Sequence, residues 1–448
     1  MLSNDFIILE LRDFVVTPIW LIMIYVLAYF IRPYVTDKIN RRYFFPALTI
    51  KIIGALAVGF IYQFYYNGGD TYNYHTHGSR HIWEAIMDSP DGFNLIFGGD
   101  VTGLYQYYSR IPFYTDSGSY FIVRIAALFD LITFSSYSAT AILFAVISFV
   151  GMWFFFKAFY EQLPHLHRWI ALSAFFIPSV FFWGSGLLKD TITLASVGAM
   201  TFALKRILID NKLQLGSVLL FLIGAYFIFS TKKYILLCFL PAAIFWIYFS
   251  NLNRIRSLAM RILLIPFILL VVIGSGYWAV LKVSESDVRY SLSKIPETAK
   301  ITAYDIAFQT GRDAGSTYSL GELDGTFRNM ISKTPQAINV ALFRPYLWEV
   351  RNPLMALSAL ESFAILLFTL YVLIIRRSVF FRMITDPNII FCLVFCLTFA
   401  FAVGISTYNF GTLSRYRIPL LPFYLMALGL MFDYSKSERK LEVFEETE

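Results

Sequence analysis

The sequence predicts an all-α integral membrane protein, and three observations support this. Of its 448 residues, 58% are hydrophobic and only 15% are charged, and a mean hydropathy of +0.62 lies well outside the range of soluble globular chains. Apolar runs of the roughly 17 to 20 residues that a membrane-spanning helix needs recur along the chain, and we expect about eleven such helices. Lys and Arg gather in every second loop between these runs, which is the pattern that the positive-inside rule describes.

The predicted spans share a long apolar run and little charge. They are 14–31, 47–65, 138–156, 169–183, 187–204, 215–230, 234–249, 262–281, 353–375, 389–405 and 418–433. The loops expected on the cytoplasmic side carry Lys38, Arg41, Arg42, Lys205, Arg206, Lys212, Arg254, Arg256, Arg261, Arg376, Arg377 and Arg382. This alternation places the N-terminus outside. The first residues lack the basic start of a cleaved signal peptide, so we expect the first span to be retained.

Two long polar segments, 66–137 and 282–352, follow spans that exit on the same, outer side. Within the first of them, 120–134 is apolar but short, and it carries Arg124 and Asp130. We therefore expect a helix that lies at the membrane interface there. The last segment, 434–448, is rich in charge and is expected to be a solvated cytoplasmic tail without fixed structure.

The stretch 65–81, YYNGGDTYNYHTHGSRH, is where a long apolar run meets polar chemistry. Asp70 follows two glycines, and His75, His77 and Arg80 follow within about three helical turns. Polar groups this dense cannot enter lipid without partners, so they indicate the rim of an active site at the membrane surface. The alternative is a solvated loop in which the glycines only make a turn and Asp70 only caps the next helix. Asp100, in a second GGD, is the competing carboxylate.

Basic residues on the predicted outer face depart from the usual charge bias and are therefore informative. They are Lys189, which adjoins Asp190, then Lys232, Lys233, Arg344, Arg351, Arg415 and Arg417. We interpret them as substrate-binding residues that contact a phosphate group, because guanidinium forks bind phosphate in two places and lysine offers a point charge. The alternative for Lys189 and Asp190 is a simple pair at the lipid headgroups.

Two further patterns invite a ligand. His75 and His77 alternate, and His77 and His81 are one helical turn apart, but no Cys joins them and the spacing is not that of a closed zinc site. We therefore expect no cofactor, and a divalent metal is the disfavoured alternative. The aromatic residues of 343–348, FRPYLW, could stack on a sugar ring through Trp348, or they could belong to a headgroup-level aromatic belt.

Several motifs resemble those of the polytopic GT-C glycosyltransferases, which take sugars from polyprenyl-phosphate carriers. GGDTYN at 68–73 stands where that superfamily carries its catalytic acidic residue, early in the first outer loop. SRYRIPLLPFY at 414–424 looks like a stretch of the bacterial Pmt and RgtA-D-like branch. PSVFFWGSGLLKD at 178–190 and FRPYLWEVRNPL at 343–354 are similar to segments of membrane proteins from polysaccharide clusters. A second carboxylate paired as D-x-D is absent.

The resemblance covers roughly 47–433 and implies a domain plan. A seven-helix module would occupy 47–281 and include the outer loop 66–137. The second outer loop would be 282–352, and three C-terminal spans would fill 353–433. An additional N-terminal span with its cytoplasmic loop, 1–46, would precede the module, and the cytoplasmic tail, 434–448, would follow.

The function implied is transfer of a sugar from polyprenyl phosphate to an acceptor glycan or lipid, on the outer face of the cytoplasmic (inner) membrane of a bacterium. Asp70 would be the general base, and the outer Lys and Arg residues would stabilise the leaving phosphate. The expected partners are the lipid-linked sugar, the acceptor and membrane lipids. Scattered basic residues speak against nucleic acid. The alternatives are a polysaccharide polymerase or ligase, a flippase or transporter for lipid-linked glycans, and a structural scaffold.

Overall fold

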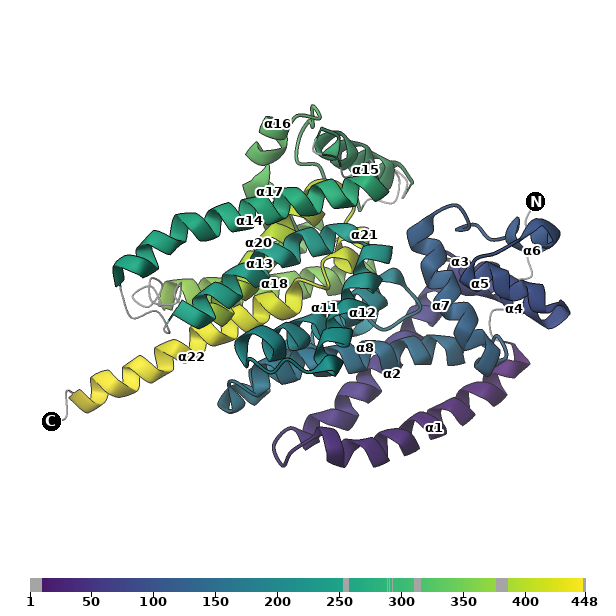
Figure 1. Cartoon of the computed structure of the whole chain (residues 1–448), viewed down its shortest axis with the longest axis horizontal. Helices are drawn as coiled ribbons and strands as arrows, with labels where there is room; N and C mark the ends of the chain where they lie inside the picture. The colour runs from purple at the N-terminus through teal and green to yellow at the C-terminus, as the bar shows by residue number, and fades with distance from the viewer. Residues whose placement is uncertain are drawn as a thin grey trace. The chain divides into compact units, whose positions relative to one another are not determined.

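The computed structural model describes residues 10–252, 258–287, 289, 291, 293–309, 316–375 and 386–445. These residues are almost entirely helical, and the β-type pairing recorded among them is an isolated bridge between Thr317 and Asn409. The chain divides into two compact units, which we describe separately (Figure 1). Unit 1 is Met1–His167, Ala174–Phe202 and Leu219–Lys232, and unit 2 is Arg168–Ser173, Ala203–Val218 and Lys233–Glu448.

Eight helices within the described residues are long and apolar enough to cross a membrane, so the chain is a multi-pass membrane protein. They are Leu11–Val35 (α1), Arg41–Phe64 (α2), Tyr137–Tyr160 (α8), Lys189–Ile209 (α11, Lys189–Leu204, with its π-helical end), Lys233–Asn251 (α13), Pro266–Glu285 within α14 (Leu258–Ser286), Pro353–Ile374 within α18 (Pro353–Ile375) and Pro387–Thr407 (α20). Two shorter apolar helices are Leu215–Thr231 (α12) and the part Leu421–Asp433 of α22. The prediction of an all-α membrane protein is confirmed, and the count of about eleven spans stays a prediction.

The range predicted as one span at 169–183 is two short helices instead. Helix α9 is His167–Phe175, and α10 is Pro178–Trp183. Pro178 begins α10 at a position where its missing N–H is tolerated, and the extended backbone of Ile177 (φ −74°, ψ 124°) is what a following proline favours. This proline should have divided the predicted span.

Unit 1 is built on close packing between α2 and its neighbours α8 and α10, with α1 against α2 and α8 (Figure 1). Small residues make the contacts possible. A Cβ at Gly54 of α2 would lie 2.1 Å from the carbonyl oxygen of Phe181, and one at Gly151 of α8 would lie 2.3 Å from Ala195. Small residues at such contacts let helices approach closely where lipid supplies no hydrophobic drive between them.

The predicted loop 66–137 is mostly helical. It contains α3 (Asp70–Tyr74), a π-helical turn (His75–Ser79), α4 (Arg80–Asp88), α5 (Asn94–Phe97), α6 (Tyr105–Tyr108) and α7 (Ser117–Thr133). Helix α7 occupies the range expected for the interfacial helix. It packs against α3, α4 and α8, and its residue Asp130 is completely buried. The carboxylate that suggested an interfacial helix therefore points into the protein.

Unit 2 is centred on α20, which packs against α13, α15 (Ile295–Gln309), α17 (Thr334–Phe343) and α22 (Leu421–Glu445). Its core is aromatic: the rings of Trp246 and Phe391 stack with centroids 4.2 Å apart. Helix α17 lies within the predicted polar loop 282–352, yet it is buried against α20, where a Cβ at Gly404 would be 2.1 Å from the carbonyl oxygen of Ala337. That segment is therefore part of the core rather than a free loop.

The C-terminal segment is also more ordered than expected. Helix α22 continues from Leu421 to Glu445, whereas a tail without fixed structure was predicted from 434. Its Glu, Lys, Arg and Leu residues have high helix propensity and extend the preceding helix. The basic residues Arg254, Arg256, Arg376, Arg377 and Arg382, which support the predicted orientation, lie outside the described residues.

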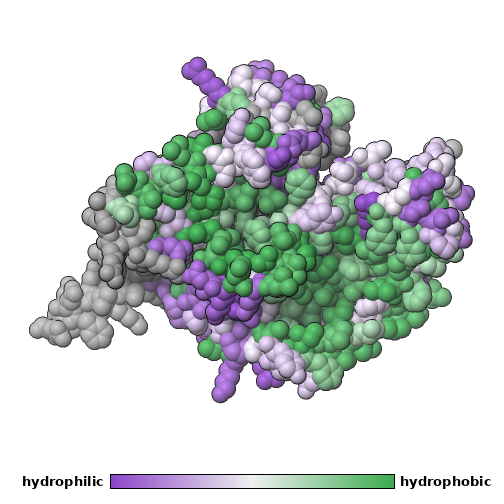
Figure 2. Space-filling model, in the orientation of Figure 1, coloured by the Kyte–Doolittle hydropathy of each residue, from purple (hydrophilic) through white to green (hydrophobic). Residues whose placement is uncertain are grey.

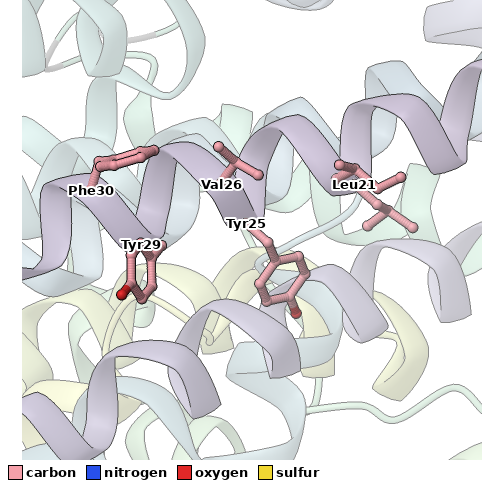
Figure 3. A pocket seen from close by; sticks show the side chains of 6 residues that line it. Leu21, Tyr25, Val26, Tyr29 and Phe30 are labelled. Atoms are coloured by element: carbon pink, nitrogen blue, oxygen red, sulfur yellow. The ribbon is translucent and has the colours of Figure 1, made fainter.

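Large apolar side chains cover much of the surface in Figure 2, as expected for helices that face lipid. Helix α1 shows this well, because Phe14, Ile22 and Phe30 are all more than half exposed. A shallow hollow on α1 is lined by Leu21, Ile22, Tyr25, Val26, Tyr29 and Phe30 (Figure 3). None of these side chains is charged, so this hollow contains none of the charged residues predicted for the site.

Candidate functional site

Asp70 is the first residue of α3, and it lies a few residues beyond the end of α2 at Phe64. Gly68 and Gly69 have φ values of +123° and +122°, which L side chains rarely adopt, so the turn that delivers Asp70 requires glycine at both positions. A Cβ at Gly68 would meet nothing within 4 Å, so the space beside it is open. Asp70 is half-buried, and the N-cap of α3 is Gly69 rather than Asp70. The alternative role as a helix cap is therefore filled by another residue.

His75 is completely buried, not exposed at a rim. Its Nε2 lies 3.2 Å from Oδ1 of Asp130, although the approach is too oblique for a normal hydrogen bond. Asp130 also accepts hydrogen bonds from Ser79 (2.5 Å) and Thr140 (2.8 Å). This buried cluster ties the π-helical turn to α7 and α8. His75 therefore supports the segment that carries Asp70 and, in this structure, faces the protein interior.

Arg80 also has protein partners. Its guanidinium donates to Glu10 (2.5 Å) and to the carbonyl oxygen of Ser135 (3.4 Å). Burial opposes ionisation of Glu10, but its hydrogen bonds and charge interactions with Arg12 and Arg80 outweigh burial and lower the pKa of Glu10. Arg80 thus anchors α4 to the segment just before α1.

His77 and His81 do not converge with His75 on one point. Burial lowers the pKa of His77, and the nearby His81 and Arg80 lower it further. Nδ1 of His81 pairs with Glu84 at 3.0 Å. Among the residues that the structure describes, no three His, Cys, Asp or Glu side chains gather as metal ligands.

The two residues that follow Asp70 form hydrogen bonds through their hydroxyl groups. The hydroxyls of Thr71 and Tyr137 are 2.8 Å apart, and Tyr72 donates to the carbonyl oxygen of Gly59 (2.9 Å). Burial, followed by the charge of Asp13, raises the pKa of Tyr72. These bonds hold the start of α3 against α2 and α8, so the backbone of Asp70 is well supported.

Asp100, the competing carboxylate, lies on an exposed loop. Its Oδ1 accepts hydrogen bonds from the backbone N–H and the hydroxyl of Thr102, and these bonds lower the pKa of Asp100. Its side chain therefore shapes its own turn and is exposed, whereas Asp70 is half-buried.

Lys189 and Asp190, adjacent in sequence, pair with different residues. Nζ of Lys189 is 2.9 Å from Asp116, the residue that caps α7. Burial opposes ionisation of Asp116, but hydrogen bonds from Ser119 and the charge of Lys189 lower the pKa of Asp116 to about 2. This pair is partly exposed, so water and ligands can reach it.

Asp190 and Lys232 form a second and more buried pair, with Nζ and Oδ1 2.5 Å apart. The two pairs therefore bring together two lysines and two aspartates. Lys233 begins α13 in unit 2 and is half-buried.

In unit 2, Arg344 forms a two-pronged ion pair with Glu349. Its guanidinium also lies 5.1 Å from the ring centroid of Phe410 and 5.5 Å from that of Tyr318. Trp348 stacks on Tyr346 with ring centroids 4.8 Å apart, and it is 79% exposed. An exposed ring fixed in this way could stack on a sugar or lie at the headgroups, so both interpretations of Trp348 stay open.

Arg417 is completely buried. Nη1 donates to the carbonyl oxygen of Arg344 (3.0 Å) and to Ser362 (2.8 Å), while Nη2 lies 3.2 Å from Glu361. Arg415, two residues earlier, is half-buried and lies over the ring of Tyr416. The contacts shown for Arg417 are all with protein, and its contact with a carrier phosphate stays a prediction.

Sequence reasoning missed most of the partners. The predicted site residues did not include Asp116, Glu349 or Asp130. Each of these three carboxylates nevertheless pairs with a residue that was predicted to belong to the site. A usable signal existed for Asp116, because DSGS before an apolar run is a helix N-cap pattern. The chain matches no family model, no curated protein and no solved structure.

Proposed function

We propose that this chain is a membrane glycosyltransferase of the GT-C type, which moves a sugar from a polyprenyl-phosphate carrier to an acceptor glycan or lipid. We place the reaction on the outer face of a bacterial cytoplasmic membrane, and the branch resembled is the Pmt and RgtA-D-like one. The observation that carries the proposal is the position of Asp70. It is a half-buried carboxylate that follows a turn of two glycines, a few residues beyond the end of a membrane-spanning helix.

The other carboxylates of this region are less suited to the reaction. Asp130 is completely buried and surrounded by Ser79, Thr140 and His75, so an acceptor cannot reach it. Asp116 caps the start of α7, where it accepts hydrogen bonds from the N–H and the hydroxyl of Ser119. A general base must come within hydrogen-bond reach of the proton that it removes. Asp70 is half-buried, so part of its side chain is open to an acceptor.

In the proposed reaction, Asp70 takes the proton of an acceptor hydroxyl as its oxygen bonds to the anomeric carbon of the sugar. The bond from that carbon to the phosphate oxygen breaks, and polyprenyl phosphate leaves with the electron pair. A cation near the leaving oxygen stabilises the charge that develops there. We assign this role to Lys189, because its pair with Asp116 is partly exposed and can be reached by a ligand.

The test uses purified full-length protein in lipid nanodiscs with radiolabelled polyprenyl-phosphate hexoses and pentoses, and it measures release of polyprenyl phosphate. General-base catalysis is worth roughly a hundredfold to ten-thousandfold. We expect Asp70→Asn to lose at least about a hundredfold in turnover, because the substitution keeps the shape and removes the base. The matched control is Asp100→Asn, which should retain near-normal transfer.

The remaining outcomes decide between the alternatives. If Asp100→Asn loses activity and Asp70→Asn does not, Asp100 is the base. A ladder of repeat units in the product indicates a polymerase. If no donor of the panel is cleaved, but the wild-type protein moves the labelled lipid across the bilayer, the proposal is replaced by a transporter.

A further inference from the structure

Lys51 is a buried lysine in the middle of α2 that is bound entirely by backbone oxygens. Its side chain is completely buried, and its Nζ donates to the carbonyl oxygens of Val180 (3.2 Å) and Gly184 (3.1 Å). Within the described residues, no carboxylate forms an ion pair with it. A cation buried in a membrane-spanning helix without a counter-charge is energetically costly, so its surroundings need an explanation.

The two carbonyl oxygens belong to a break between helices. Helix α10 ends at Trp183, the chain turns through 184–188, and α11 begins at Lys189. The carbonyl oxygen of Val180 also accepts the N–H of Gly184 (3.2 Å) and has a second lone pair for Lys51, whereas the carbonyl group of Gly184 lies beyond the last residue of α10. In a membrane protein such groups must be satisfied by protein groups or by a bound ion.

Hydroxyl groups satisfy several oxygens of this break. Ser148 donates to the carbonyl oxygen of Gly184, Ser185 to that of Phe181 (2.5 Å), and Thr191 to that of Gly186 (2.5 Å). Lys51 supplies the charged donor among them. Backbone oxygens that converge at a helix break are the means by which membrane proteins hold dehydrated monovalent cations.

The break packs closely against one face of α2. Lys51, Gly54 and Val58 are three, four and seven residues apart along α2 and so share one face. A Cβ at Gly54 would be 2.1 Å from the carbonyl oxygen of Phe181, and one at Gly186 would be 2.7 Å from Val58. The backbone of the break is thus pressed against this face of α2.

We propose that the α10–α11 break is a monovalent-cation site, and that the ammonium group of Lys51 occupies it as a ligand tethered to the chain. The tethered cation holds the end of α10 in place and so positions the start of α11, which carries Lys189 and Asp190. The ligand class that this site would bind is a primary ammonium, held by carbonyl oxygens. The inference is independent of the glycosyltransferase proposal, because it concerns binding and stability alone.

The experiment measures the thermal unfolding midpoint of the full-length protein in nanodiscs with Lys51→Ala. This substitution removes the ammonium and leaves a space that fits n-propylammonium. Chloride salts of n-propylammonium, methylammonium, sodium and choline are titrated at constant ionic strength. We expect n-propylammonium to raise the midpoint of Lys51→Ala saturably, by at least about 2 °C, since a ligand that binds only the folded state stabilises it.

The controls separate a specific site from a general salt effect. Wild type should not respond, because its site is filled, and neither should Lys157→Ala, which removes a half-buried lysine of α8 that pairs with Glu161. If sodium raises the midpoint of Lys51→Ala as much as n-propylammonium does, the site also accepts a metal ion in place of the Lys51 ammonium. That result would support the proposal of a monovalent-cation site. Equal effects of choline and n-propylammonium on Lys51→Ala would overturn it.

A second variant provides an independent test if Lys51→Ala cannot be isolated. Lys51→Met keeps the length and volume of the side chain but removes the charge. We expect it to unfold at a lower temperature than wild type and to be insensitive to every salt of the panel. If Lys51→Met is as stable as wild type, the cation is not needed at the break and the proposal fails.

Discussion

Asp130 in unit 1 and Arg417 in unit 2 are both completely buried charges, but they are compensated in different ways. Asp130 is surrounded by the hydroxyls of Ser79 and Thr140 and by the imidazole of His75, and no Lys or Arg of the described residues pairs with it. Arg417 faces Glu361, a carboxylate that is itself only 7% exposed, as well as Ser362 and the carbonyl oxygen of Arg344.

This difference shows that the harm done by removing a buried charge depends on what is left behind. Removal of Asp130 leaves hydroxyl donors that can rotate toward another acceptor. Removal of Arg417 leaves a buried carboxylate without its cation, and the loss of one partner of a buried pair is strongly destabilising. The pair of Lys189 and Asp116 is a third case. It is partly exposed, so water can replace either partner and its removal should do less harm.

The largest effect is expected for Arg417→Met, at about 3 to 5 kcal/mol of unfolding free energy, because Glu361 loses its charged partner. Urea unfolding in mixed micelles measures it. The double variant Arg417→Met with Glu361→Gln should recover part of the loss, since no unpaired charge is then buried. If the double variant is less stable than Arg417→Met alone, the comparison with Asp130 is mistaken.

A smaller loss, about 2 kcal/mol, is expected for Asp130→Ala. Ser79 loses its acceptor, and a buried donor left without a partner costs about 1 to 3 kcal/mol, while Thr140 keeps Thr133 at 2.7 Å. The same unfolding measurement applies. Asp130→Asn, which retains one carbonyl oxygen, is the matched control and should lose less. An effect of Asp130→Ala equal to that of Arg417→Met would show that the neutral partners cannot adjust.

The smallest effect is expected at the partly exposed pair. The pKa of Asp116 is about 2 in the folded protein, below its usual 3.8, so its contribution to stability is present above pH 3.8 and is lost as the pH falls toward 2. Water screens this pair, so the contribution should stay below about 1 kcal/mol.

Unfolding midpoints measured from pH 5 to pH 2 check this expectation. The wild-type midpoint should fall more steeply than that of Asp116→Asn in that window, because only the wild type takes up a proton at position 116 on unfolding. Lys189→Gln keeps the helix cap and removes the cation, and it should give an intermediate slope. Identical slopes for wild type and Asp116→Asn would rule out the contribution of this pair.

The sequence by itself determined the class of the protein. A chain with 58% hydrophobic residues and long apolar runs has to bury its backbone polar groups in helices within a membrane. It also placed Asp70 directly after a long helix, because two consecutive glycines next to an aspartate mark a turn whatever the tertiary structure is. The helix over most of 120–134 could be predicted for the same reason, since its apolar pattern is local.

Only the tertiary structure decided which charges pair. Lys189 bonds to Asp116, 73 positions away, although Asp190 is its neighbour, and Asp190 bonds to Lys232, 42 positions away. Arg417 meets Glu361 across 56 positions. Neighbours on a helix point about 100° apart, so sequence adjacency does not bring two side chains together, whereas packing between helices does. Hydrophobic periodicity is a local property, and the partner of a buried charge is set by contacts between distant segments.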